Sequence, residues 1–86
     1  MSKAHTQNIA TLSRLFLSAR GVASMGNLVK GLFTENEITE LVRRVEIVKM
    51  LKRGMPHHKI ALTLGVGVAT VTRGAREIKM GRFKNV

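Results

Sequence analysis

The sequence predicts an all-α fold, a small helical bundle that contains a helix–turn–helix. Three observations lead to this class. Apolar residues recur at helical spacing along most of the chain. The segment "FTENEI" has the pattern of a helix N-terminus, and glycine or proline separates the successive apolar-periodic segments. With 86 residues the chain is expected to be one domain with a modest core.

Two helices are expected before residue 34. Apolar spacing predicts the first over residues 7–20, and Gly21 is expected to stop it. A second apolar segment, residues 25–33, contains two glycines and predicts a weaker helix. The apolar positions of the first helix are Ile9, Leu12, Leu15, Phe16 and Ala19.

The clearest helix is predicted to begin at Thr34. Thr34 and Glu37 form a capping box, and Phe33 is placed to pack on Ile38 as a hydrophobic staple. Gly54 is expected to end the helix. Ile47 and Met50 lie off the main apolar stripe, so the helix is expected to be buried on two sides, which points to a homodimer. The stripe comprises Ile38, Leu41, Val42, Val45, Val48 and Leu51.

The stretch "LGVGVATVTRG" is interpreted as part of a helix–turn–helix. Pro56 begins a helix over residues 57–64, Gly65 permits the turn, and a second helix follows over residues 68–80. A buried strand would need partner strands, and a phosphate-binding glycine loop would need further motif residues that are absent. An ordinary corner between two helices stays open as an alternative. The residues expected to pin the two helices together are Ile60, Ala61, Leu64, Val66 and Val71.

The distribution of charge indicates a polyanionic partner, while a basic surface that only keeps the protein soluble stays open as an alternative. The net charge is +10, and residues 49–86 carry nine basic residues against Glu77 alone. In a helix–turn–helix the N-terminal residues of the second helix face the bases, and cations around them contact phosphates. The residues expected to contact bases are Gly67, Val68, Ala69, Thr70 and Thr72, and those expected to contact phosphates are His58, Lys59, Arg76 and Lys79.

Other classes of protein are disfavoured. The chain has no cysteine, and His57 and His58 are adjacent and point apart on a helix, so no metal site is expected. No nucleophile–base pair indicates an enzyme, and no catalytic residue is proposed. The longest uncharged run, residues 60–72, is shorter than the ~20 residues of a membrane span. A soluble, cytoplasmic protein with no membrane partner is expected.

These motifs resemble the tryptophan operon repressor superfamily. "FTENE", "RRVEIV" and "VATVTRG" carry the resemblance, which covers about residues 32–80. It implies an intertwined helical homodimer that represses transcription from palindromic operator DNA, with L-tryptophan or a related molecule as corepressor. Residues 1–33 would be dimerisation helices, residues 34–80 the core helix with the DNA-binding region, and residues 81–86 a basic tail.

The resemblance also implies a corepressor site. Arg44 and Arg73 match the arginines that sandwich the ligand's indole ring, Thr34 with Arg73 would hold its carboxylate, and Gly74 would allow close approach. Each residue has a simpler interpretation. Thr34 is explained by capping, Arg44 by a surface position along apolar neighbours, and Arg73 by a phosphate contact.

Departures from the family pattern are also present. Glu77 stands where the family has a small serine near the ligand's amino group, and "RGMPHHKI" is shorter than in tryptophan-regulated members. The family's last helix has no counterpart before Val86, and the tail "GRFKNV" is expected to lie on DNA instead. The alternative functions are a sequence-neutral nucleic-acid packaging protein and a membrane-surface or protein-interaction module.

Overall fold

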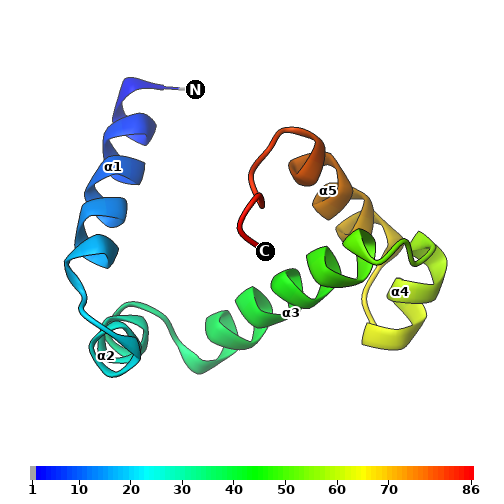
Figure 1. Ribbon diagram of the computed structural model, residues 1–86, viewed down its shortest axis with the longest axis horizontal. Coiled ribbons are helices and arrows are strands. Elements are labelled where there is room, and N and C mark those ends of the chain that lie inside the picture. The colour runs from blue at the N-terminus through cyan, green and yellow to red at the C-terminus, as the bar shows by residue number, and fades with distance from the viewer. Residues whose placement is uncertain (1) are drawn as a thin grey trace. The chain divides into compact units, whose positions relative to one another are not determined.

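The computed structural model describes residues 2–86, and within them the secondary structure is entirely helical (Figure 1). This confirms the predicted fold class. The chain divides into two compact units, one ending at Ile38 and the other spanning Thr39–Val86, and each is described by itself. The helices are α1 (Lys3–Ser18), α2 (Val22–Leu32), α3 (Glu35–Lys52), α4 (His57–Leu64) and α5 (Val68–Lys79).

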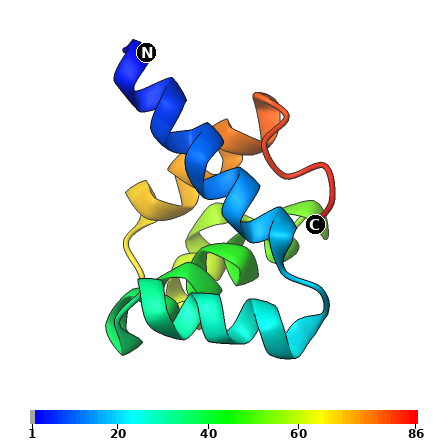
Figure 2. The same ribbon diagram turned by 90° about the vertical axis from the view of Figure 1, so that its left-hand side faces the viewer.

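The first unit consists of α1, α2 and the first turn of α3 (Figure 2). Helix α1 begins earlier than the apolar pattern predicts, because the Ser2 side chain caps it by accepting a 3.1 Å hydrogen bond from the His5 amide. Gly21 is the N-cap of α2, with φ of 92°, and α2 starts at Val22 rather than residue 25. Within this single chain, α1 and α2 contain no buried residue.

The predicted capping box is confirmed at the start of α3. The Thr34 amide donates to Glu37 Oε1 at 2.9 Å, and the Glu37 amide donates to Thr34 Oγ1 at 3.2 Å. Two amides that have no partner inside the helix are thereby satisfied. The local sequence alone therefore determines where α3 begins.

The second unit has a core that α3, α4 and α5 share. Ile47 is 1% exposed and packs with Ile60, Ala61 and Val71. Val42, on the predicted apolar stripe of α3, is 55% exposed. Helices α4 and α5 pack against the C-terminal part of α3. Ile47, which lies outside the predicted apolar stripe, is therefore buried, while part of the predicted stripe stays exposed. The residues packed around the core are Met50, Leu51, Met55, Leu64 and Val66.

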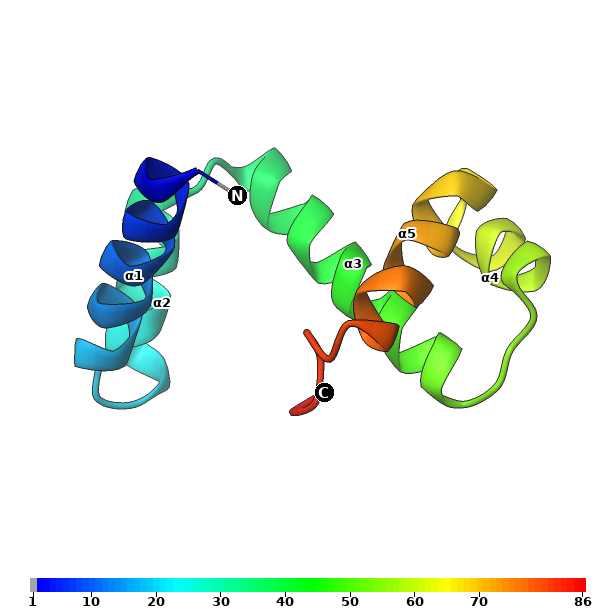
Figure 3. The ribbon, with the colours of Figure 1, turned by 90° about the horizontal axis from the view of Figure 1, so that it is seen from above.

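Helices α4 and α5 form the helix–turn–helix, with the most extensive helix–helix contact in residues 2–86 (Figure 3). Gly65 ends α4 in the left-handed conformation, with φ of 65°, and the Val66 amide donates to the Ala61 carbonyl at 3.0 Å. Gly67 is the N-cap of α5 at φ of −72°. Both helices lie where the sequence predicts them.

The tail after α5 turns back onto α3. The Lys52 ammonium donates to the carbonyl oxygens of Phe83 and Val86, the latter at 2.9 Å. The Arg82 amide donates to the Glu77 carbonyl at 3.1 Å. The described segment 81–86 is thus held against its own unit. Across residues 2–86, no helix is both long enough and apolar enough to cross a membrane.

Candidate nucleic-acid interface and adjoining pocket

The N-terminal turns of α5 present small, uncharged side chains outward. Val71 is fully buried and packs in the core with Ile60, which fixes the orientation of the helix. Val68, one turn before Val71 at the N-terminal end of α5, is 51% exposed. Methyl and hydroxyl groups on an exposed helix surface suit contact with base edges. The five predicted base-contacting residues, Gly67, Val68, Ala69, Thr70 and Thr72, are all exposed there.

Basic side chains lie on the same two helices. His58 and Lys59 are in the first turn of α4, and Arg76 and Lys79 are in the last turn of α5. All four are exposed, and within residues 2–86 none of them forms an ion pair. The structure thus places the predicted base-contacting and phosphate-contacting residues on one helix–turn–helix. Solvated cations of this kind are available to phosphates.

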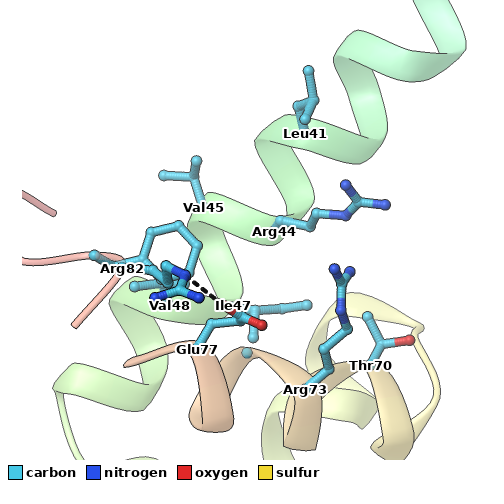
Figure 4. A pocket seen from close by; sticks show the side chains of 11 residues that line it. Leu41, Arg44, Val45, Ile47, Val48, Thr70, Arg73, Glu77 and Arg82 are labelled. Atoms are coloured by element: carbon cyan, nitrogen blue, oxygen red, sulfur yellow. Dashed lines mark ion pairs between the residues drawn. The ribbon is translucent and has the colours of Figure 1, made fainter. Parts of the chain in front are cut away.

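A pocket of about 390 Å³ lies beside the helix–turn–helix, within the second unit. It brings together three residues of the predicted corepressor site: Arg44 from α3 and Arg73 and Gly74 from α5 (Figure 4). The fourth, Thr34, is not part of this lining and belongs to the first unit. Much of the wall is apolar and comes from Leu41, Val45, Ile47, Val48 and Phe83.

Charged groups occupy the rim of this pocket. Arg44 and Arg73 extend from the two helices toward the same space (Figure 4), and within residues 2–86 neither forms an ion pair. Glu77 is paired, because its Oε2 lies 3.4 Å from Arg82 Nε. The lining therefore combines two unpaired cations with one neutralised carboxylate.

Gly74 packs closely against α3, whereas its predicted role in the approach of a ligand stays a prediction. A Cβ at this position would lie 3.1 Å from Ile47 Cγ2 and 3.5 Å from Leu51 Cδ1. The missing side chain therefore lets α5 cross α3 near the pocket floor. A ligand that approached Gly74 would therefore lie close to the side chains of Ile47 and Leu51.

Sequence reasoning missed the contribution of the tail to the pocket. Arg82 and Phe83 both line it, and Lys52, which anchors the tail, lies 31 residues from Phe83. No local pattern signals a contact over such a separation. Thr70, predicted only as a base contact, also lines the pocket. In the described residues, no cluster of three or more histidine and acidic side chains has the geometry of a metal site.

Known proteins provide the comparison for this arrangement. The family model described as Trp repressor protein matches residues 7–85. A "Trp operon repressor homolog" of Vibrio vulnificus (strain YJ016) is 44% identical over 54 residues, which cover 62% of this chain and 53% of the relative. One of Aliivibrio fischeri (strain MJ11) is 39% identical over 71 residues, covering 78% and 66%.

A further relative comes from a different bacterium. The "Uncharacterized protein YerC" of Bacillus subtilis (strain 168) is 30% identical over 81 residues, covering 94% of this chain and 78% of the relative. The chain spans about half the length of the first Vibrio relative, and no solved structure matches it significantly. Because the family model covers nearly all of the sequence, the chain belongs to the Trp repressor family.

Proposed function

We propose that this protein is a sequence-specific DNA-binding transcriptional repressor that reads its operator with the first turns of α5. The observation that carries the proposal is the uncharged, exposed surface of α5 around Ala69 and Thr70, fixed from beneath by buried Val71. The second helix of a helix–turn–helix enters the major groove with its N-terminal residues foremost. Membership of the Trp repressor family supports the same function.

The exposed residues of α5 have distinct roles in this proposal. Val68 and Ala69 contact thymine methyl groups, while Thr70 and Thr72 bind base edges directly or through water. Gly67 has no side chain, so the helix N-terminus approaches the DNA closely. Discrimination between operators therefore depends on small side chains whose replacement changes shape rather than charge.

The cations around this surface supply affinity without reading sequence. His58 and Lys59 on α4 and Arg76 and Lys79 on α5 are assigned to phosphates on either side of the recognition surface. Each neutralised phosphate releases counterions, so the binding constant should fall steeply with salt.

A homodimer is part of the proposal. Leu12 and Leu15 on α1 are 46% and 37% exposed, and Val42 on α3 is 55% exposed. A second copy of the chain would cover such faces, with residues 1–33 as the dimerisation helices and residues 34–80 as the core helix and reading unit. The two recognition helices would then enter successive major grooves about 34 Å apart on a palindromic operator.

The pocket beside α5 is assigned to a small-molecule corepressor, L-tryptophan or a related compound. Arg44 and Arg73 flank the space in which a planar ring would stack, and Gly74 lies at its floor. A ligand wedged between α3 and α5 would bias the angle of the recognition helix. Thr34 stays a prediction for the ligand's carboxylate.

The test is binding to duplexes selected from a random library by the purified protein. Fluorescence anisotropy should give at least a thousandfold tighter binding to a selected duplex than to a scrambled one at the same salt concentration. Equal affinity for both would favour the sequence-neutral packaging protein. An absence of binding to any duplex would reject both functions.

A further inference from the structure

Two of the chain's three histidines are adjacent in the first turn of α4. His57 and His58 are both exposed, and within residues 2–86 neither forms an ion pair. An unperturbed imidazole gains or loses its proton between about pH 5 and pH 8, whereas lysine and arginine keep their charge throughout this range. The basic surface of the helix–turn–helix therefore has one part with constant charge and one part whose charge depends on pH.

The first turn of α4 is held firmly on the unit that carries the reading surface. Ile60 and Ala61, which follow this turn, are 0% and 7% exposed and pack in the core with Val71 of α5. Helices α4 and α5 also lie side by side (Figure 3). In a helix–turn–helix the first helix crosses the sugar–phosphate backbone while the second enters the major groove. The two imidazoles are therefore expected close to the DNA backbone.

The charged groups on the elements packed against α4 are mostly basic. These elements are α5 and the C-terminal part of α3. The two carboxylates of residues 46–86 are Glu46 on α3 and Glu77 on α5, and neither pairs with a histidine, because Glu77 pairs with Arg82 and Glu46 forms no ion pair. In the described chain, a protonated imidazole in this turn thus has no carboxylate partner. The basic groups on these elements and after α3 are Lys49, Lys52, Arg53, Arg73, Arg76 and Lys79.

Bound DNA would supply the missing anionic partner for these imidazoles. A phosphate beside a histidine favours the protonated form of the side chain. Binding and protonation are then linked, because DNA promotes the uptake of a proton and the proton strengthens binding by the same factor. The gain in affinity is complete at acidic pH and is lost as the pH rises through the range in which histidine titrates.

We propose that His57 and His58 make the affinity for DNA depend on pH, so that the protein holds its operator more tightly as the pH falls. The inference rests on the proposed DNA-binding function and names a regulation of that same surface. Contacts to phosphates carry no sequence information, so the preference among duplexes, which α5 sets, should stay the same at every pH.

Fluorescence anisotropy over a pH series tests the proposal on the purified full chain. Binding to a selected duplex at one ionic strength should be about tenfold tighter at about pH 6 than at about pH 8. A scrambled duplex should gain by a similar factor, because the contacts involved are to the backbone. An affinity that stayed constant over this range would overturn the proposal.

Substitutions in the first turn of α4 then separate titration from the simple loss of a contact. The pair His57→Gln and His58→Gln should reduce the pH effect to less than about twofold. Lys59→Gln is the matched control from the same turn, and it should weaken binding at every pH without changing the pH dependence. His58→Lys keeps its charge and should bind about tenfold more tightly than His58→Gln at about pH 8. Full pH dependence in the double variant would assign the effect to other groups and reject the proposal.

His5 provides the control for a histidine outside the helix–turn–helix. It lies on α1 in the first unit, and His5→Gln should keep the full pH dependence. Loss of the pH effect in His5→Gln would place its source in the first unit and overturn the role of α4. Circular dichroism melts establish that each variant is folded at both ends of the pH series.

The outcome is separable from that of the proposed function. Selective binding of a selected duplex at about pH 7 with a flat pH profile would reject the pH dependence alone. An absence of selective binding at every pH would reject the proposed function itself.

Discussion

At the scale of single residues, two neighbouring glycines differ in what they contribute. Gly65 has φ of 65° and Gly67 has φ of −72°, and a Cβ at either position would meet nothing within 4 Å. Only Gly65 is in a conformation that L-residues avoid. Glycine is therefore needed at position 65 for the left-handed backbone conformation of the turn. At position 67 the absence of a side chain instead keeps the surface at the start of α5 accessible.

Gly65→Ala should destabilise the protein by about 1–2 kcal/mol, since alanine is strained in the left-handed region. Gly67→Ala is the control and should be close to neutral, within about 0.5 kcal/mol, because the lower entropy of the unfolded chain offsets the lost preference for glycine at the N-cap. Urea denaturation at one fixed protein concentration measures both. Equal effects on the free energy of unfolding would contradict the assignment of the turn to Gly65.

Substitutions in the proposed DNA interface should have two kinds of effect: those at phosphate contacts change affinity for every duplex, and those at base contacts change the preference among duplexes. Arg76→Ala should weaken binding to all duplexes by a similar factor and lower the salt slope by about 0.9, because it removes one phosphate contact. Ala69→Leu should change the preference among duplexes, because it alters the shape that faces the bases. Anisotropy titrations over a salt series measure both. If Ala69→Leu left affinity and preference intact, α5 would not be the recognition helix.

At the scale of elements, prediction succeeds where the signal is local. Thr34, Gly65 and Pro56 mark helix ends through contacts within a few residues, and the helices around them lie as expected. The early start of α1 was missed, although the signal was the polar side chain of Ser2. The partner of each face of α3 could not be predicted, because an apolar stripe does not specify what covers it.

Thr34 can be tested for its two predicted roles separately. Thr34→Ala should cost about 1 kcal/mol of stability, and Thr34→Asp should cost almost nothing, because aspartate also caps a helix. If Thr34 binds a ligand carboxylate, Thr34→Asp should weaken L-tryptophan binding by about tenfold through repulsion. Thermal melts and calorimetric titration measure the two effects. Unchanged affinity in Thr34→Asp would leave capping as its whole role.

At the scale of the whole molecule, contacts between distant parts of the chain could not be predicted from the sequence. Arg82 and Phe83 reach the pocket through a reversal of the chain that follows Gly81, at φ of 81°. That contact depends on tertiary structure, so the tail was expected on DNA and not beside α3. The family-derived positions Arg44, Arg73 and Gly74 do lie in one pocket, whereas composition and spacing alone would not have grouped them.

Self-association provides the prediction at this scale. Leu12→Glu places a charge on the exposed apolar face of α1 and should raise the dimer dissociation constant by at least a hundredfold. Thr11→Glu is the control, since Thr11 is a neighbouring exposed polar residue. Sedimentation equilibrium compares the two variants with the parent chain. Identical self-association in both would place the dimer interface elsewhere.

The anchor of the tail has an evolutionary consequence. Lys52 binds the main-chain carbonyls of Phe83 and Val86, groups that nearly every amino acid presents in the same way. Mutation of the tail's side chains therefore leaves the anchor's acceptors in place. During evolution, residues 82 and 83 could therefore change beside the pocket while the contacts that hold the tail against α3 are kept.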